Sequence, residues 1–212
     1  EIIRVAKMCG ADAIHPGYGL LSENPDFVDA CEEAGIKFIG PKAETMRKLG
    51  DKASARRVAM EAGVPVVPAT DVLPDDMNKV RQMAEEVGYP FMLKASWGGG
   101  GRGMRPIMDA SELEEKVLEG RREAEAAFGN GEGYLERLVE RARHVEVQIL
   151  GDSFGEIYHL YERDCSVQRR NQKVVERAPA PYLTEEQRSE ICSLGRKICA
   201  HVGYECAGTV EF

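Results

Sequence analysis

Apolar residues change from a strand-like to a helical spacing and back again over the first forty residues. Short apolar runs predict buried strands at residues 11–15 and 36–39. Between them, Asn24 followed by Pro25 has the form of an N-cap and a first-turn proline, and Gly35 has the form of a helix end. Two strands separated by a helix of this size predict part of a parallel α/β sheet.

Further helices are predicted where apolar residues recur at the helical period. Two of them start with a capping box, Ser111-x-x-Glu114 and Thr184-x-x-Gln187. The predicted helical segments are residues 1–9, 42–62 with a break at 50–51, 75–87, 111–128 and 184–202. Residues 63–74 contain three prolines and no helical period, which is typical of a linker and marks a possible domain boundary.

Strands are predicted mainly in the second half of the chain. The predicted strands are residues 91–96, 104–108, 134–139, 143–150, 156–161 and 207–212. In residues 143–150, valine and isoleucine alternate with His144, Glu146 and Gln148. This alternation predicts one packed face and one polar face. The pattern slightly favours solvated surface for the polar face, and the lining of a cleft is the alternative.

The composition is that of a folded protein with an acidic balance. Of the 212 residues, 43% are apolar and 30% are charged, and 28 Lys+Arg against 36 Asp+Glu give a net charge of −8. These values exclude wholesale disorder. Because sequence-independent nucleic-acid binding needs excess positive charge, we expect no nucleic-acid partner. No apolar run approaches the roughly 20 residues that cross a bilayer, so we expect no membrane segment.

The six cysteines are scattered, without a CxxC pair or a Cys/His set at zinc spacing. This distribution favours reduced, mostly buried thiols over disulfides or a metal site.

The strongest chemical signal is the run Lys94-Ala-Ser-Trp-Gly-Gly-Gly-Gly-Arg-Gly-Met104. Glycines lack Cβ atoms, so their backbone N–H groups can converge on a polyanion, as in phosphate-binding loops. The run lacks the ending of a Walker A loop, and a flexible hairpin tip is the alternative. Lys94 lies in an apolar strand, where an ammonium without a partner is costly. We therefore favour a phosphate contact for Lys94 over a lysine that reaches solvent from a strand end.

Residues 162–176 concentrate positive charge in this acidic chain. Arg163, Arg169, Arg170 and Lys173 are interleaved there with Gln, Asn and carboxylates, which indicates a polar network around an anion. Glu211 lies in the last predicted strand and is either a surface residue or a ligand of a hard cation.

Several motifs in sequence order make the chain resemble the biotin carboxylase module of biotin-dependent carboxylases, a branch of the ATP-grasp family. The motifs are residues 15–23, 38–45, 50–52, 94–105, 143–148, 162–176, 178–181 and 208–211. The resemblance covers essentially the whole chain and implies an α/β fold of the α+β ATP-grasp type, present as an incomplete fragment.

The resemblance divides the chain into four segments. Residues 1–40 would be the C-terminal part of a Rossmann-like preATP-grasp domain, and 41–66 a helical linker. Residues 67–139 would be the ATP-grasp lid subdomain, and 140–212 the first part of the central ATP-grasp sheet.

Most of the residues to which the resemblance assigns a role would bind ATP. They are Lys52, Lys94, Gly100, Gly101, Glu136, Arg137, Leu138, Val139, His144 and Asn171. The two lysines would contact phosphates, the two glycines would close over them, and residues 136–139 would hold adenine through backbone hydrogen bonds. His144 and Asn171 would lie beside the nucleotide. Asn171 stands where the bacterial acetyl-CoA carboxylase subunit usually has histidine.

Two further residues would belong to the implied site. Lys173 would hold bicarbonate, and Glu211 would bind Mg²⁺ or Mn²⁺ that bridges ATP phosphates. The implied reaction phosphorylates bicarbonate with ATP and then carboxylates N1′ of biotin. Such a site must neutralise a triphosphate and a second anion at once, which explains lysines, a divalent cation and glycine amides.

Trp97 and the stretches 66–76 and 159–173 favour the pyruvate carboxylase branch, whose members make oxaloacetate from pyruvate. The alternatives are a module that serves acetyl-CoA or another acyl-CoA, and a nucleotide-binding module without turnover. The implied partners are bicarbonate, a biotin carrier domain, a carboxyltransferase domain and further copies in a homo-oligomer. The expected location is the cytoplasm of a bacterium or the mitochondrial matrix of a eukaryote.

Both ends of the sequence have the form of cuts, because it starts without methionine and stops inside a predicted strand. The second metal carboxylate, the catalytic base and the arginines for bicarbonate and biotin are expected beyond Phe212. Residues 1–212 alone are therefore expected to hold most of an ATP pocket and to be inactive.

Overall fold

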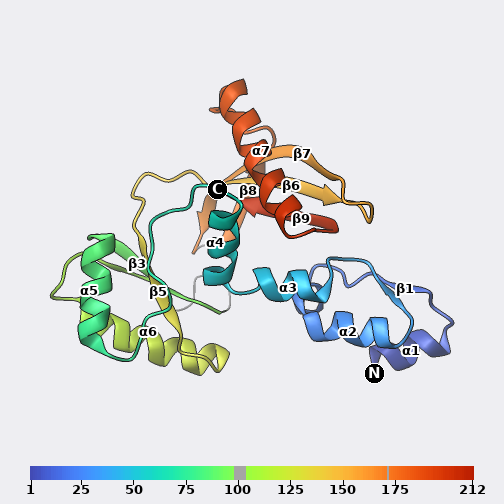
Figure 1. The fold of residues 1–212 in the computed structure, drawn as a ribbon, viewed down its shortest axis with the longest axis horizontal. Coiled ribbons are helices and arrows are strands. Elements are labelled where there is room, and N and C mark those ends of the chain that lie inside the picture. The colour runs from blue at the N-terminus through green and yellow to red at the C-terminus, as the bar shows by residue number, and fades with distance from the viewer. Residues whose placement is uncertain (98–103, 171) are drawn as a thin grey trace. The chain divides into compact units, whose positions relative to one another are not determined.

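The computed structural model describes residues 1–97, 104–170 and 172–212, which form two compact units (Figure 1). The first unit comprises residues 1–50, 145–164 and 177–212, and the second comprises 51–144 and 165–176. These units are defined by contacts, and the four segments expected from the sequence stay a prediction.

The N-terminal part of the first unit has the predicted parallel strand pair. Strand β1 (Ala13–Ile14) pairs in parallel with β2 (Lys37–Phe38), and the helices are α1 (Ile2–Met8), η1 (Leu20–Glu23), α2 (Pro25–Glu33) and α3 (Ala43–Leu49). The Asn24 side chain accepts a hydrogen bond of 2.8 Å from the Phe27 N–H, so the predicted N-cap of α2 is confirmed. Val28 and Cys31 of α2 pack on Phe38 and Ala43 in a small core.

The rest of the first unit is a helix on an antiparallel sheet. Strand β6 (Val145–Gly151) lies between β7 (Ile157–Arg169) and β9 (Cys206–Glu211), and α7 (Glu185–His201) covers one face. A Cβ on Gly195 of α7 would stand 3.4 Å from the side chain of Val147, so helix and sheet approach closely there. The predicted capping box of α7 is confirmed, with Thr184 and Gln187 bonded in both directions.

Strand β7 is longer than the sequence predicts, and β8 (Gln172–Arg177) follows it without having been predicted. The predicted strand ended at residue 161, whereas β7 continues to Arg169. Charged side chains occupy residues 162–177 at positions where a half-buried strand usually carries apolar ones, so the period-two hydrophobic signal is absent. Several of these charges are instead buried in ion pairs.

The second unit is built on a three-stranded antiparallel sheet (Figure 1). Strand β3 (Phe91–Ala95) lies between β4 (Arg105–Ile107) and β5 (Gly133–Arg137), and the helices are α4 (Lys52–Glu61), α5 (Met77–Val87) and α6 (Leu113–Phe128). Val80 of α5 and Val117 of α6 pack against Phe91, Leu93 and Leu135 of the sheet.

The capping box predicted at Ser111 is wrong. Helix α6 begins at Leu113, its N-cap is Glu112, and no side chain caps it. The Ser111 hydroxyl and backbone N–H donate to Oδ1 of Asp109, at 2.5 and 2.8 Å. Because the Ser111 hydroxyl is already hydrogen-bonded to Asp109 in this turn, it does not cap the helix that follows.

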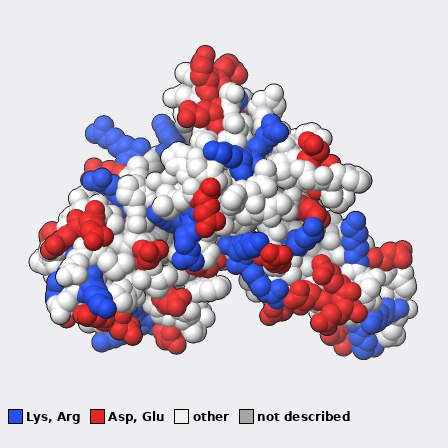
Figure 2. All heavy atoms as spheres, in the orientation of Figure 1, with Lys and Arg blue, Asp and Glu red and all other residues white. Residues whose placement is uncertain are grey.

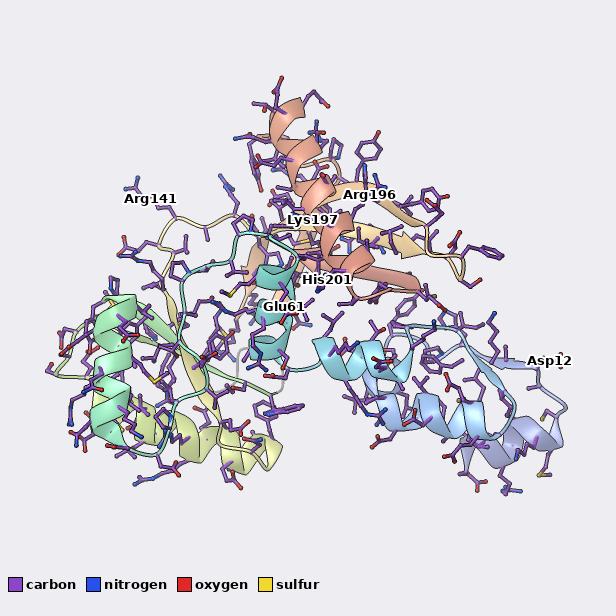
Figure 3. The ribbon with its side chains drawn as sticks, in the orientation of Figure 1. Asp12, Glu61, Arg141, Arg196, Lys197 and His201 are labelled. Atoms are coloured by element: carbon purple, nitrogen blue, oxygen red, sulfur yellow. The ribbon has the colours of Figure 1, made fainter. Side chains whose placement is uncertain are left out.

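The charge balance does not give the surface a single sign. On the face in Figure 2, Asp and Glu side chains lie among Lys and Arg side chains in both units. Among the described residues, no helix has the length and apolar character that crossing a membrane requires.

Candidate active site

Lys94 sits at the half-buried polar end of β3, as its sequence context predicts. Phe91, Leu93 and Ala95 are buried, whereas the Lys94 side chain is 23% exposed and forms an ion pair with Glu136 of β5. The Glu136 side chain is 17% exposed. This pairing offsets the cost of placing an ammonium in an apolar strand. The phosphate contact of Lys94 stays a prediction, with Glu136 as the partner present.

Tyr134 lies directly opposite Lys94 on β5 and is buried. Burial, assisted by the nearby Glu136 carboxylate, raises the pKa of the Tyr134 hydroxyl well above its ordinary value. The Tyr134 hydroxyl therefore stays neutral beside Lys94.

Lys52 reaches the same end of β3 from another element. Asp51 caps α4 by accepting from the Ala53 and Ser54 N–H groups at 3.1 and 2.9 Å, which makes Lys52 the first residue of the helix. The Lys52 N–H donates to the Ser96 carbonyl at 3.4 Å. Two lysines are thus placed at the start of the glycine-rich run. Gly100 and Gly101 of that run, and Asn171, lie outside the described residues.

The predicted adenine-binding segment is the end of β5 and the residues after it. Glu136 and Arg137 belong to the strand, and Leu138 and Val139 follow. The Arg137 N–H donates to the Pro68 carbonyl at 2.8 Å, and the Leu138 N–H donates to the Pro90 carbonyl at 3.0 Å. These bonds fix the backbone of the segment, and its contact with adenine stays a prediction.

A row of charged residues crosses the first unit on the sheet face opposite α7. Arg163 of β7 lies directly opposite Glu146 of β6, which in turn lies opposite Glu211 of β9. Glu146 is only 2% exposed and forms an ion pair with the Arg163 guanidinium. The surface interpretation of this polar face is therefore wrong for Glu146. Val147 and Ile149 take the face that packs on α7, so Glu146 is buried on the opposite one.

Glu146 and Glu211 carry carboxylate oxygens within 4.8 Å of one another. Like charges directly opposite on neighbouring strands are unfavourable unless a cation lies near. Carboxylate oxygens are the ligands that hard divalent cations prefer, so this donor pair fits Mg²⁺ or Mn²⁺. The sequence analysis proposed Glu211 alone and missed Glu146, although the alternation in residues 143–150 puts Glu146 on a polar face.

Gln148 joins this row to the backbone of β9. Its Oε1 accepts from the Arg163 Nη1 at 3.0 Å, and its Nε2 donates to the Gly208 carbonyl at 2.9 Å. Gly208 leaves no room for a side chain, because a Cβ there would overlap the Tyr204 hydroxyl.

Two acidic residues of β7, Glu162 and Asp164, are buried and form hydrogen bonds with the segment before α7 and with Arg188 of that helix. Glu162 accepts from the Ala180 N–H and from Arg188 Nε, both at 2.9 Å. Asp164 accepts from the Tyr182 hydroxyl at 3.0 Å and from Arg177 at 3.3 Å. This part of residues 162–176 is a structural network, and its binding of an anion stays a prediction.

Two other predicted site residues are placed by the second unit. The His144 N–H donates to the Ser166 hydroxyl at 3.0 Å, and His144 Nδ1 lies 3.1 Å from the amide nitrogen of Gln168. Lys173 is half-buried on β8. Their contacts with nucleotide and bicarbonate stay predictions.

Two families match the chain along its length. Residues 51–212 match the family described as carbamoyl-phosphate synthase L chain, ATP binding domain, and residues 1–46 match biotin carboxylase, N-terminal domain. The mitochondrial pyruvate carboxylase of Mus musculus is 54% identical over 212 residues, which are 100% of this chain and 18% of the mouse protein. The chain therefore spans about a fifth of that relative.

The whole chain is also similar to solved structures of other carboxylases. A pyruvate carboxylase variant of Rhizobium etli with acetyl coenzyme-A is 65% identical with a TM-score of 0.92, and the match covers 18% of that chain. The biotin carboxylase domain of Hydrogenobacter thermophilus 2-oxoglutarate carboxylase, solved with MgADP, ADP and bicarbonate, is 49% identical with a TM-score of 0.95. This match covers 47% of the Hydrogenobacter chain.

Proposed function

The chain belongs to the biotin carboxylase family of ATP-grasp enzymes, and on this premise we propose that the full-length protein carboxylates biotin with ATP and bicarbonate. The observation that carries the proposal is the convergence of Lys52 and Lys94 on the start of the glycine-rich run. Two lysines beside a glycine-rich sequence suit a triphosphate.

Lys94 has a built-in partner that keeps it in place for phosphate binding. Glu136 holds the Lys94 ammonium at the end of β3, so the side chain loses less freedom when a phosphate arrives. Lys52 adds a second positive charge from the first turn of α4, where the helix N-terminus also favours anions.

Glu211 would hold the cation, and Glu146 lies opposite Glu211 on the neighbouring strand. A bound divalent ion supplies charge neutralisation for the transferring phosphoryl group. Glu211 and Glu146 would hold the ion, and Lys52, Lys94 and Lys173 would orient the two anions and limit their mutual repulsion.

Bicarbonate is the second anion that the site must bind, and Lys173 is its proposed ligand. In the proposed step, a bicarbonate oxygen forms a bond to the γ-phosphorus of ATP while the bond from that phosphorus to the ADP oxygen breaks. In the second step, the carboxyl carbon of the resulting carboxyphosphate forms a bond to N1′ of biotin, which gives up its proton. The bond from that carbon to the phosphate oxygen breaks, and phosphate leaves. The Hydrogenobacter relative was solved with MgADP and bicarbonate together, which supports this pair of ligands.

We further propose pyruvate as the final acceptor, because the mouse and Rhizobium relatives are pyruvate carboxylases. On this proposal a biotin carrier domain and a carboxyltransferase domain work with the module, within a homo-oligomer. The protein acts in the cytoplasm if its source is a bacterium and in the mitochondrial matrix if its source is a eukaryote.

Replacing Lys94 tests the proposed ATP site. In the full-length protein, Lys94→Gln is expected to raise the KM for ATP and to slow bicarbonate-dependent ATP cleavage by at least about tenfold, because a charge-assisted phosphate contact is lost. Lys79→Gln on α5 is the matched control, since Lys79 is exposed and lies outside the proposed site. Steady-state kinetics with and without bicarbonate make the measurement. Unchanged ATP kinetics in Lys94→Gln would remove Lys94 from the site.

A further inference from the structure

The position of the Glu211 carboxylate depends on strand β9, which lies at the edge of its sheet. Among the described strands, β9 pairs with β6 alone. Strand β6 has an irregular register on its other side. Glu162 of β7 lies opposite Val147, but His159 lies opposite Ile149. Two residues of β7, Leu160 and Tyr161, therefore face the single position of Gln148.

This bulge takes Gln148 out of the regular residue pairing with β7, and its side chain makes a connection to β7 instead. The Arg163 guanidinium donates to Gln148 Oε1 at 3.0 Å, one residue pair beyond the irregularity. On the β9 side, Gln148 is opposite Thr209, and its Nε2 reaches the Gly208 carbonyl at 2.9 Å. One amide thus links β7, β6 and β9 at a point where the regular ladder is interrupted.

The geometry points to Gln148 as a positioning residue for the cation ligand Glu211, with Arg163 as its anchor. This inference rests on the proposed function, because it concerns the cation that the proposed reaction needs. Gly208 precedes Glu211 by three residues in β9, so fixing its carbonyl fixes the register and twist of the strand that carries the ligand. Arg163 also neutralises Glu146, which prevents the buried carboxylate from repelling Glu211.

Arginine is required for the anchoring role, and lysine is not equivalent. The planar guanidinium donates to Glu146 with Nε and to Gln148 with Nη1 at the same time. A lysine keeps the positive charge beside Glu146 but has a single ammonium for both acceptors. Arg163→Lys therefore keeps the positive charge but removes the simultaneous hydrogen bonds to Glu146 and Gln148, so it tests these bonds separately from the charge.

The test measures binding of Mn²⁺ by electron paramagnetic resonance, in the full-length protein with a non-hydrolysable ATP analogue. Gln148→Met keeps the side-chain length and removes the side-chain hydrogen bonds to Arg163, Gly208 and Ile149. It is expected to weaken Mn²⁺ binding about tenfold, the usual effect of losing a residue that orients a ligand. Arg163→Lys is expected to weaken it in the same direction. Amide exchange of residues 206–211 is expected to become faster in Gln148→Met.

Gln187→Met is the matched control. Gln187 is also a glutamine of the first unit with a structural hydrogen bond, to the Thr184 N–H at 3.0 Å, but it caps α7. This variant is expected to loosen α7 and to leave Mn²⁺ affinity unchanged. Mn²⁺ affinity at the wild-type value in Gln148→Met would overturn the positioning role and leave the proposed function intact. Wild-type protein that binds Mn²⁺ but cleaves no ATP with bicarbonate would overturn the proposed function instead.

Discussion

Single buried carboxylates determine much of the first unit, and Glu162 is the clearest case. Its side chain has no solvent exposure, and Arg188 pairs with it. The same Arg188 also pairs with Glu185, whose side chain is 87% exposed. The two ion pairs of Arg188 therefore allow a direct comparison of the stability contributed by a buried carboxylate and by an exposed one. Water compensates for the loss of the exposed pair, whereas nothing compensates for loss of the buried one.

Glu162→Gln is therefore expected to lower the local stability of residues 177–212 by about 2 kcal/mol, because a buried charge-assisted network loses its anion. Glu185→Gln is expected to have no measurable effect. Hydrogen exchange of α7 and of the loop before it reports local opening in the full-length protein. Equal loss of protection in the two variants would contradict the assignment of Glu162 as the structural partner of Arg188.

The cysteines also behave as individual residues rather than as a site. Cys31, Cys165, Cys192 and Cys199 are buried, and none of the six described cysteines forms a disulfide. Burial raises the pKa of the Cys199 thiol from 9.0 to about 12, so the thiol stays protonated and unreactive at neutral pH. Cys192 and Cys199 belong to one hydrophobic core with Val147 and Ile149, which agrees with the expectation of mostly buried thiols.

At the scale of elements, helix starts show where local sequence signals decide and where they do not. Thr184 and Ser111 carry the same four-residue signature, yet only Thr184 caps a helix. The Ser111 hydroxyl instead donates a hydrogen bond to the preceding Asp109, a residue that is not part of the four-residue signature. The signal is thus reliable only when the residues before it leave the cap free.

Thr184→Ala is expected to destabilise the first turns of α7 by about 1 kcal/mol, since an N-cap hydrogen bond is lost. Ser111→Ala is the control with the same sequence signature and is expected to leave α6 protection unchanged. Amide exchange of the two helices in the full-length protein measures both. Comparable loss of protection in α6 would mean that Ser111 contributes a cap after all.

The sequence predicted strands correctly where one face of the strand is apolar. The prediction failed where the strand buries charged side chains. The strands β3, β6 and β9 were predicted close to their observed bounds, because their apolar residues alternate or run together. The second half of β7 and all of β8 were missed. Burial there is achieved by ion pairs such as Arg163 with Glu146, which need partners from distant parts of the sequence.

At the scale of the whole molecule, the residues with proposed roles are divided between the two units. The second unit carries Lys52, Lys94 and the start of the glycine-rich run, and the first carries Glu146 and Glu211. Lys94 could be proposed from the sequence because a lysine in an apolar strand stands out. Glu146 could not be assigned, because its burial and its register against Glu211 exist only in the folded sheet.

The central claim is that this module drives carboxylation of biotin with ATP, and transfer of labelled carbon tests it most directly. Full-length protein is incubated with radioactive bicarbonate, free biotin, Mg²⁺ and ATP, and acid-labile label on biotin is counted. The account predicts labelled biotin that requires both ATP and Mg²⁺ and falls at least about tenfold in Glu211→Gln, a variant that lacks the proposed cation ligand. Absence of label from the wild-type protein, or full labelling without ATP, would contradict the claim.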